Sequence, residues 1–261
     1  CRYIVENLCP RFGIEFTLVD GRDLNQWEAA IKPNTKAFFF ETPANPTLDV
    51  VDIAGVSKLA KRIGAVTIVD PMTVDIAVKN PAEPLLIDGR EVLTGIRKRP
   101  VTGERIVKPL GLDGDEQADL SVHGGLSKAV YAYPTEHYDF WRTVRAQAQV
   151  AGWEAPLPWG AMGENLSLSG LLEGDAYIGD VLVFPGCELA ISEPRYPCFK
   201  FNAAMGFNKA VKMMSQSGWC GFYLAVRQPG TIEAGQSFTL RPGPREVSVA
   251  EIFRSKMKGK D

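Results

Sequence analysis

The sequence lacks the features that define several protein classes. No apolar run approaches the roughly 18 residues that cross a bilayer, and no signal peptide is evident, so we expect no membrane association and a cytoplasmic location. The net charge of the 261 residues is -2, which gives no overall attraction to nucleic acid. The chain has 2 histidines and 5 cysteines without a CxxC pair, which argues against zinc and iron–sulfur sites.

Residues 1–71 alternate between predicted strands and predicted helices. The expected strands are 14–19, 37–40 and 65–69, and the expected helices are 24–31 and one that runs from Asp52 to Gly64. Asp23 and Asp52 precede the two helices as N-caps, and the apolar runs at 37–40 and 65–69 predict strands buried on both faces. The order of these elements predicts a parallel α/β unit.

Two motifs in this first part, FETPANPT at 40–47 and TIVD at 67–70, resemble the Cys/Met-metabolism enzymes that depend on pyridoxal phosphate (PLP), in particular O-succinylhomoserine sulfhydrylase. The resemblance implies that Asp70 would pair with the pyridinium nitrogen. The phosphate-binding loop and the Schiff-base lysine are both missing, and without that lysine the chemistry cannot start. We therefore expect residues 1–71 to be a truncated PLP-transferase-like fragment that does not bind pyridoxal phosphate productively. The alternative is an accessory domain of the protein's own.

The pattern changes at Met72, and residues 72–261 form the second predicted domain. Short strands dominate it, and Asp88-Gly89 is a favoured turn dipeptide between predicted strands 85–87 and 91–96. The basic cluster at 97–99 is expected to be a solvated turn. Many short strands with few helices predict a closed or partly closed β-barrel.

The segment 193–202, EPRYPCFKFN, is the strongest candidate for a functional loop. Pro194 and Pro197 keep the chain extended, so the loop can hold the thiol of Cys198 in one direction. The flanking cations Arg195 and Lys200 favour the thiolate, which is the form that attacks or binds a soft metal. A buried structural cysteine is the alternative.

Four motifs, in order along the chain, resemble the MOSC-domain proteins. They are GLDGDEQAD at 111–119, VHGG at 122–125, GENL at 163–166 and the Cys198 loop. The resemblance implies a β-barrel MOSC domain that binds the molybdenum cofactor, with Cys198 as the metal ligand or as a sulfur carrier. It also implies reduction of N-hydroxylated purines, which is the activity of the bacterial branch that these motifs most resemble.

The same motifs supply further residues of the predicted site. Arg195 and Lys200 can hold the phosphate of the pterin cofactor. His123 can hydrogen-bond an oxo group or the pterin, or move a proton, and a buried structural role is the alternative. Gly124 and Gly125 beside it leave room for the backbone to approach a ligand closely.

Four more polar residues belong to the prediction. Lys128 can reach the phosphate, and the amide of Asn165 can both donate to and accept from a heterocycle. Glu164 can act as a proton donor if it is buried, although we expect it to be exposed. Asn202 closes the cysteine loop or caps the turn that follows. The residues read as surface or packing positions are His137, Cys187 and Cys220.

The favoured function is molybdenum-dependent reduction of an N-hydroxylated base or a related N-hydroxy compound. Its electrons must come from an external reductase protein, because the chain has no glycine motif for a flavin or nicotinamide and no cysteine set for an iron–sulfur cluster. Two alternatives are open: a non-catalytic carrier of cofactor or sulfur, and a PLP-dependent sulfhydrylase suggested by the first segment. The sequence leaves open whether the chain forms a homodimer.

Overall fold

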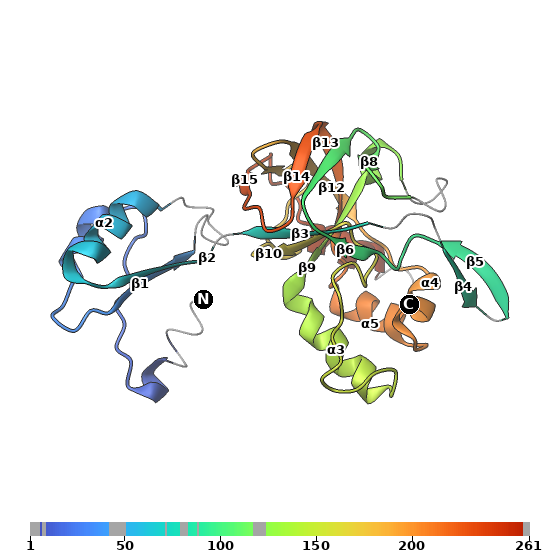
Figure 1. Ribbon diagram of the computed structural model, residues 1–261, viewed down its shortest axis with the longest axis horizontal. Helices are drawn as coiled ribbons and strands as arrows, with labels where there is room; N and C mark the ends of the chain where they lie inside the picture. Colours follow the sequence, from blue (N-terminus) through green and yellow to red (C-terminus); the bar gives the residue numbers. More distant parts are fainter. Residues whose placement is uncertain are drawn as a thin grey trace. The chain divides into compact units, whose positions relative to one another are not determined.

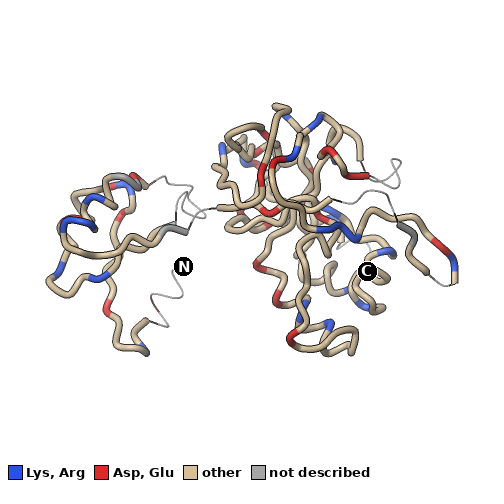
Figure 2. Tube along the Cα trace, viewed as in Figure 1, with Lys and Arg blue, Asp and Glu red and all other residues tan. Residues whose placement is uncertain are grey.

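The computed structural model describes residue 6 and residues 9–41, 51–70, 72–78, 83–87, 89–116 and 124–257. The chain divides into two units, Cys1–Pro71 and Met72–Asp261 (Figure 1). No helix in the described ranges is both long enough and apolar enough to span a membrane. Basic and acidic residues are interspersed along both units (Figure 2).

The first unit is a partial parallel α/β unit. Its elements are the 3-10 helix Cys9–Phe12, α1 (Leu24–Ala29), β1 (Ala37–Glu41), α2 (Ile53–Ile63) and β2 (Val66–Asp70). Strands β1 and β2 pair in parallel, as predicted, with Ala37 opposite Val66. The predicted strand over 14–19 is wrong: this segment is irregular, because no strand in the described part of the chain pairs with its backbone.

Capping sets the boundaries of both helices in this unit. The Asp23 carboxylate accepts a hydrogen bond from the Asn25 N–H at 2.9 Å, and the Asp52 carboxylate accepts one from the Gly55 N–H at 2.9 Å. Gly64 ends α2 with a φ of 69°, a left-handed conformation that a residue without a Cβ adopts at little cost. All three boundaries agree with the sequence pattern.

The sheet of the first unit is covered on one face only. Phe38 is buried against the ring of Trp27, with ring centres 5.5 Å apart. On the opposite face Phe39, Val66 and Ile68 are 36%, 59% and 47% exposed. The prediction of strands buried on both faces is therefore wrong for this chain, because no second layer of described residues covers that face.

The second unit is built on an eight-stranded sheet. Its strand order is β15 (Thr239–Arg241), β11 (Val181–Val183), β12 (Glu188–Pro194), β13 (Phe222–Gln228), β9 (Val130–Pro134), β10 (Leu166–Ser169), β3 (Thr73–Val78) and β6 (Arg99–Val101). All neighbours are antiparallel except β9 and β10. Two smaller sheets are β14 (Gly230–Glu233) with β7 (Glu104–Lys108) and β8 (Gly111–Leu112), and the hairpin of β4 (Glu83–Ile87) with β5 (Arg90–Thr94).

The closed or partly closed β-barrel predicted from the sequence is not confirmed. Among the described residues, no ladder joins the end strands β15 and β6 of the main sheet. The segment that precedes β15 is nevertheless joined to β3, by a bridge from Thr73 to Ser237 and by backbone hydrogen bonds that Met72 and Val74 form with residues 235–238. The unit is therefore a mixed arrangement of helices and sheets, and the hairpin β4–β5 turns at Gly89, where φ is 75°.

Four helices complete the described part of the second unit. They are α3 (Tyr138–Gln147), α4 (Lys200–Met205), α5 (Ala210–Ser217) and α6 (Val249–Met257), with short 3-10 turns at η3 (Leu126–Lys128) and η4 (Thr135–His137). Trp141 of α3 is fully buried and meets Phe201 of α4 edge to face, with ring centres 5.4 Å apart. Arg145 Nε donates to the Met205 carbonyl at 3.3 Å and ties the same two helices together.

Candidate functional site

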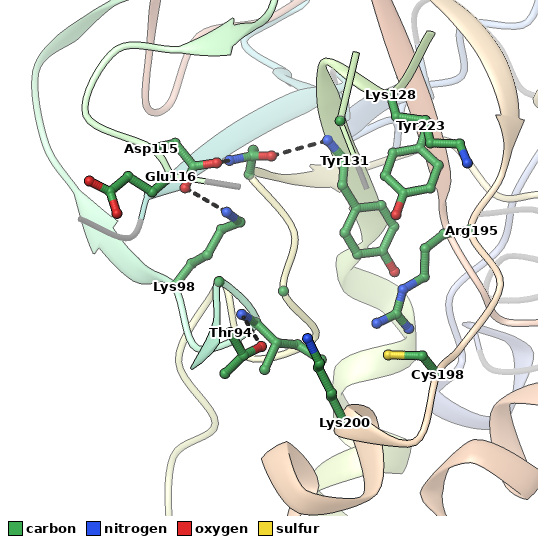
Figure 3. Close-up of a pocket in the computed structure, with 15 residues that line it drawn as sticks. Thr94, Lys98, Asp115, Glu116, Lys128, Tyr131, Arg195, Cys198, Lys200 and Tyr223 are labelled. Atoms are coloured by element: carbon green, nitrogen blue, oxygen red, sulfur yellow. Dashed lines mark hydrogen bonds and ion pairs between the residues drawn. The ribbon is translucent and has the colours of Figure 1, made fainter. Parts of the chain in front are cut away.

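A cleft in the second unit brings together segments that lie far apart in the sequence (Figure 3). The walls come from the end of β5, the turn after β8, β9, the loop before β10, the loop after β12, and β13. The lining residues are Thr94, Gly95, Ile96, Lys98, Asp115, Glu116, Gly124, Lys128, Tyr131, Gly163, Asn165, Arg195, Cys198, Lys200 and Tyr223.

Cys198 lies in the short loop between β12 and α4. Strand β12 ends at Pro194, and the Phe201 N–H donates to the Cys198 carbonyl at 2.9 Å at the start of α4. The extended segment before the cysteine and the helix after it hold its Cβ in place. The half-buried thiol points into the cleft (Figure 3).

Arg195 is buried beside Cys198, with only 4% of its surface exposed. Its guanidinium lies 5.3 Å from the ring centre of Tyr131 and 5.1 Å from that of Phe201, and it donates to Met214 Sδ at 3.2 Å. The ionisable groups that surround it in the described part of the chain are tyrosines and cysteines, and none is a carboxylate. Burial of a charge without a fixed counter-ion is unfavourable, so this arrangement calls for an anionic ligand.

The aromatic neighbours of Arg195 do not balance its charge. Burial raises the pKa of Tyr131 well above its ordinary value and also raises the pKa of Tyr223. Burial likewise raises the pKa of the Cys220 thiol well above its usual range. All three groups are therefore neutral at pH 7. The Tyr131 hydroxyl donates a hydrogen bond to the Cys220 carbonyl at 2.8 Å.

An ion pair and an amide form another wall of the cleft. Lys98 Nζ lies 2.5 Å from Asp115 Oδ1, and the two side chains are 6% and 5% exposed. Asn165 Nδ2 donates to the other Asp115 oxygen at 2.8 Å, and Asn165 Oδ1 accepts from the Tyr131 N–H at 3.1 Å. The backbone of β9 thereby sets the orientation of the amide, and the amide orients the carboxylate.

Two further lysines lie at the cleft on the side of Arg195. Lys128 Nζ is 3.7 Å from Glu193 Oε2 and 5.8 Å from the ring centre of Tyr223. Lys200 Nζ donates to the Leu93 carbonyl of the β4–β5 hairpin at 3.1 Å. Together with Arg195 they give the cleft three cationic side chains in addition to Lys98.

The structure places six of the residues predicted for the site on the cleft. They are Gly124, Lys128, Asn165, Arg195, Cys198 and Lys200. Gly125 does not line it. Asn202 lies within α4 and its side-chain oxygen accepts from the Val211 N–H at 2.8 Å, so it joins α4 to α5. His123 lies outside the described residues.

Glu164 is buried, which corrects the expectation that it is exposed. It has 0% exposure and accepts hydrogen bonds from the Gly160 N–H at 2.8 Å, the Met162 N–H at 3.0 Å, and the hydroxyls of Ser167 and Tyr138. Burial raises the pKa of Glu164, and these donors act against the rise. The carboxylate holds the loop that leads into Asn165 rather than facing the cleft.

His137 is also buried, contrary to the surface position expected for it. Its Nε2 lies 2.9 Å from Glu173 Oε2, and its ring stacks on Trp219 with centres 4.6 Å apart. Cys187 and Cys220 are buried as expected, and burial raises the pKa of Cys187 to about 11.

Sequence reasoning missed several residues of the cleft, chiefly Lys98, Asp115, Tyr131 and Tyr223. Lys98 belongs to the basic cluster 97–99, which was expected to be solvated, and its burial depends on a carboxylate 17 positions away. Asp115 sits inside the GLDGDEQAD motif, which was the one signal that could have drawn attention to it. The two tyrosines lie in strands where alternation alone does not separate core from cleft.

The arrangement defines a class of site: a thiol in a cationic cleft of a mixed helix–sheet unit. A MOSC domain family model matches residues 119–239, and the chain belongs to the MOSC domain family. It is 37% identical to the protein YflK of Bacillus subtilis (strain 168) over 168 residues, which cover 64% of this chain and 72% of YflK. A protein named "Reductase" from Gibberella moniliformis is 32% identical over 64% of this chain and 30% of its own length.

Solved structures agree with this family assignment. The crystal structure of YiiM from Geobacillus stearothermophilus is similar to 73% of this chain and 86% of that chain, with a TM-score of 0.56 and 32% identity. MOSC domains as a family are associated with binding of the molybdenum cofactor.

The first unit matches a different family. A model of the Cys/Met metabolism PLP-dependent enzymes matches residues 1–83. O-succinylhomoserine sulfhydrylase of Mycobacterium tuberculosis (strain H37Rv) is 46% identical over 70 residues, which cover 27% of this chain and only 17% of that enzyme. The model match continues past residue 71 into β3, although β3 pairs with β10 and β6 in the main sheet of the second unit.

Proposed function

We propose that this protein reduces N-hydroxylated bases or related N-hydroxy compounds with the molybdenum cofactor, and that Cys198 is the ligand of the metal. The observation that carries the proposal is the pairing of a buried Arg195, which lacks a carboxylate partner among the described residues, with the thiol of Cys198 in one cleft. A buried cation next to a soft ligand suits a group that is both anionic and metal-bearing.

The residues of the cleft fit the parts of that cofactor. The thiolate of Cys198 is a soft ligand for the metal, and Arg195, Lys128 and Lys200 supply positive charge for a phosphate. When bound, the cofactor supplies the two electrons that reduction of an N–OH group requires. An external reductase protein delivers those electrons, and the chain's own side chains bind, orient and protonate the substrate.

The proposal is tested with protein produced in a host that makes the molybdenum cofactor. We expect about one molybdenum per chain, by metal analysis, and reduction of an N-hydroxylated purine when a reductase system is added. Cys198→Ser should abolish turnover and lose the metal or change its spectrum, because a hard hydroxyl replaces a soft thiolate.

The matched control is Cys187→Ser, at a buried cysteine that does not line the cleft. It should cost about 1–3 kcal/mol of stability, since it buries a hydroxyl among apolar neighbours, and it should keep the metal and the activity. Protein that holds molybdenum but reduces no N-hydroxy compound would instead be a carrier. A Cys198→Ser variant with full metal and full activity would refute the proposed role of the loop.

A further inference from the structure

The cleft has walls of different chemistry. Figure 3 shows Lys98 and Asp115 on one side, with Cys198 and Arg195 on the other. The wall with the thiol has the features expected for the cofactor. If the cofactor lies against the thiol, the wall with the ion pair is left for the compound that is reduced.

The ion pair at this wall is poorly explained as a stabilising feature. Lys98 and Asp115 are each at least nine-tenths buried, and removing two charges from water offsets most of the attraction between them. The chain offers a direct comparison, because Lys108 and Asp113 form a pair of the same 2.5 Å length with side chains that are 57% and 52% exposed. Only the buried pair lines the cleft.

We propose that Lys98 is the proton donor to the oxygen of the N–OH group, with Asp115 and Asn165 as the residues that position it. This inference rests on the proposed reductase function. A fixed series of hydrogen bonds supports it: the β9 backbone orients Asn165, Asn165 orients Asp115, and Asp115 holds the ammonium group of Lys98. A donor held in this way loses little freedom when the substrate binds.

Lys98 gives up its proton as the N–O bond of the substrate breaks. The N–O bond breaks, and the oxygen leaves with the bonding pair and takes a proton from Lys98 Nζ, so that water forms. The nitrogen takes up two electrons, which the external reductant supplies and a bound cofactor would relay, and it takes a second proton from solvent. A lysine ammonium ordinarily has a pKa near ~10.4, well below the ~15.7 of water, so the transfer to a departing hydroxide is downhill. Solvent then returns a proton to Lys98.

The other two lysines of the cleft are less suited to this role. Lys128 pairs with Glu193 and its side chain is 28% exposed, and Lys200 donates to the Leu93 carbonyl on the side of the thiol. Lys98 is the most buried of the three, so its proton is delivered where water competes least.

The experiment compares two substrates on the cofactor-loaded protein: an N-hydroxylated purine and its O-acyl derivative, which releases a carboxylate and needs no proton on the leaving oxygen. Lys98→Met should lower kcat for the N-hydroxy substrate by about 100-fold or more, with cofactor content unchanged, and should leave kcat for the O-acyl substrate close to that of the parent protein. Lys108→Met, at the exposed pair, should change neither.

The possible results distinguish the role of Lys98 from the reductase function itself. Equal losses on both substrates would make Lys98 a structural residue and overturn the inference, while the reductase function would stand. If the parent protein reduces neither substrate, the proposed function falls and the inference falls with it. Lys98→Met leaves Asp115 buried without its partner and could fail to fold for that reason. In that case the double variant Lys98→Met, Asp115→Asn, in which both positions are neutral, replaces it. The double variant must show the same difference between the two substrates.

Discussion

The buried carboxylate of Glu164 holds the loop before β10, so substitutions at this position should change the free energy of unfolding. Its Oε1 accepts from the Gly160 N–H, Ser167 and Tyr138, and its Oε2 accepts from the Met162 N–H. In Glu164→Gln the amide oxygen can keep the three donors at Oε1, but the amide nitrogen then faces the Met162 N–H. One buried hydrogen bond is lost, so we expect a cost of about 1–3 kcal/mol.

Glu164→Ala should cost more, because it leaves two backbone N–H groups without acceptors. At about 1–3 kcal/mol for each, the loss is about 2–6 kcal/mol before any cavity term. Urea unfolding followed by tryptophan fluorescence suits the measurement, since four of the 5 tryptophans lie in the second unit. The control is Glu154→Gln at an exposed position, expected within about 0.5 kcal/mol of the parent.

Activity adds a second readout to the same variants. Gly163 and Asn165 flank Glu164 and line the cleft, and Gly163 has a φ of 89°, where an added Cβ would lie 2.8 Å from Ile96. Loosening this loop should displace the amide of Asn165, so turnover should fall together with stability. If Glu164→Gln matches the parent in both stability and turnover, the carboxylate does not organise the loop and the argument fails.

Three further predictions concern other parts of the chain. Arg195→Met should lower the cofactor content and leave the cofactor-free protein at least as stable as the parent, because it removes a buried charge that has no carboxylate partner among the described residues. The control is Arg142→Met, at an exposed position. A variant at Arg195 that loses stability but keeps its full cofactor content would contradict this prediction. A hydrogen bond from Arg241 lowers the pKa of Glu188, so the stability from this pair is present above the carboxyl's ordinary pKa and disappears as the pH falls through its folded value. Arg241→Gln should therefore destabilise slightly at pH 7 and not in acid, by thermal melts across pH, and an equal loss at both pH values would point to another cause. Deletion of residues 1–71 should leave a folded and soluble second unit by circular dichroism, whereas an insoluble product would show that the two units depend on one another for folding.

Much of the fold follows from local signals that need no tertiary context. Asp52 and Gly64 bound α2 because a carboxylate satisfies free N–H groups and a glycine tolerates the left-handed end. The alternation of strand and turn around Gly89 predicted the β4–β5 hairpin. The loop of Cys198 was recognisable for the same reason, since two prolines, a thiol and two cations lie within the seven residues 194–200.

Burial of charged and polar side chains was decided by the tertiary structure. Glu164, His137 and Lys98 look like surface residues in the sequence, because a charged residue is normally solvated unless partners are found for it. Those partners come from distant segments: Glu173 for His137 is 36 positions away, and Asp115 for Lys98 is 17 positions away. Periodicity carries no information about such pairings.

The sequence by itself determined most of the local elements and the family resemblance of each part, and it drew attention to Cys198, which lines the cleft. Each of these depends on neighbours along the chain or on motifs of fixed spacing. The tertiary structure alone decided that the end strands β15 and β6 of the main sheet form no ladder with each other among the described residues. It also decided that Arg195 is enclosed by Tyr131 and Phe201 with no described carboxylate beside it. Strand closure and the local balance of charge depend on which segments meet in space, and segments far apart in the chain meet only when the whole unit packs.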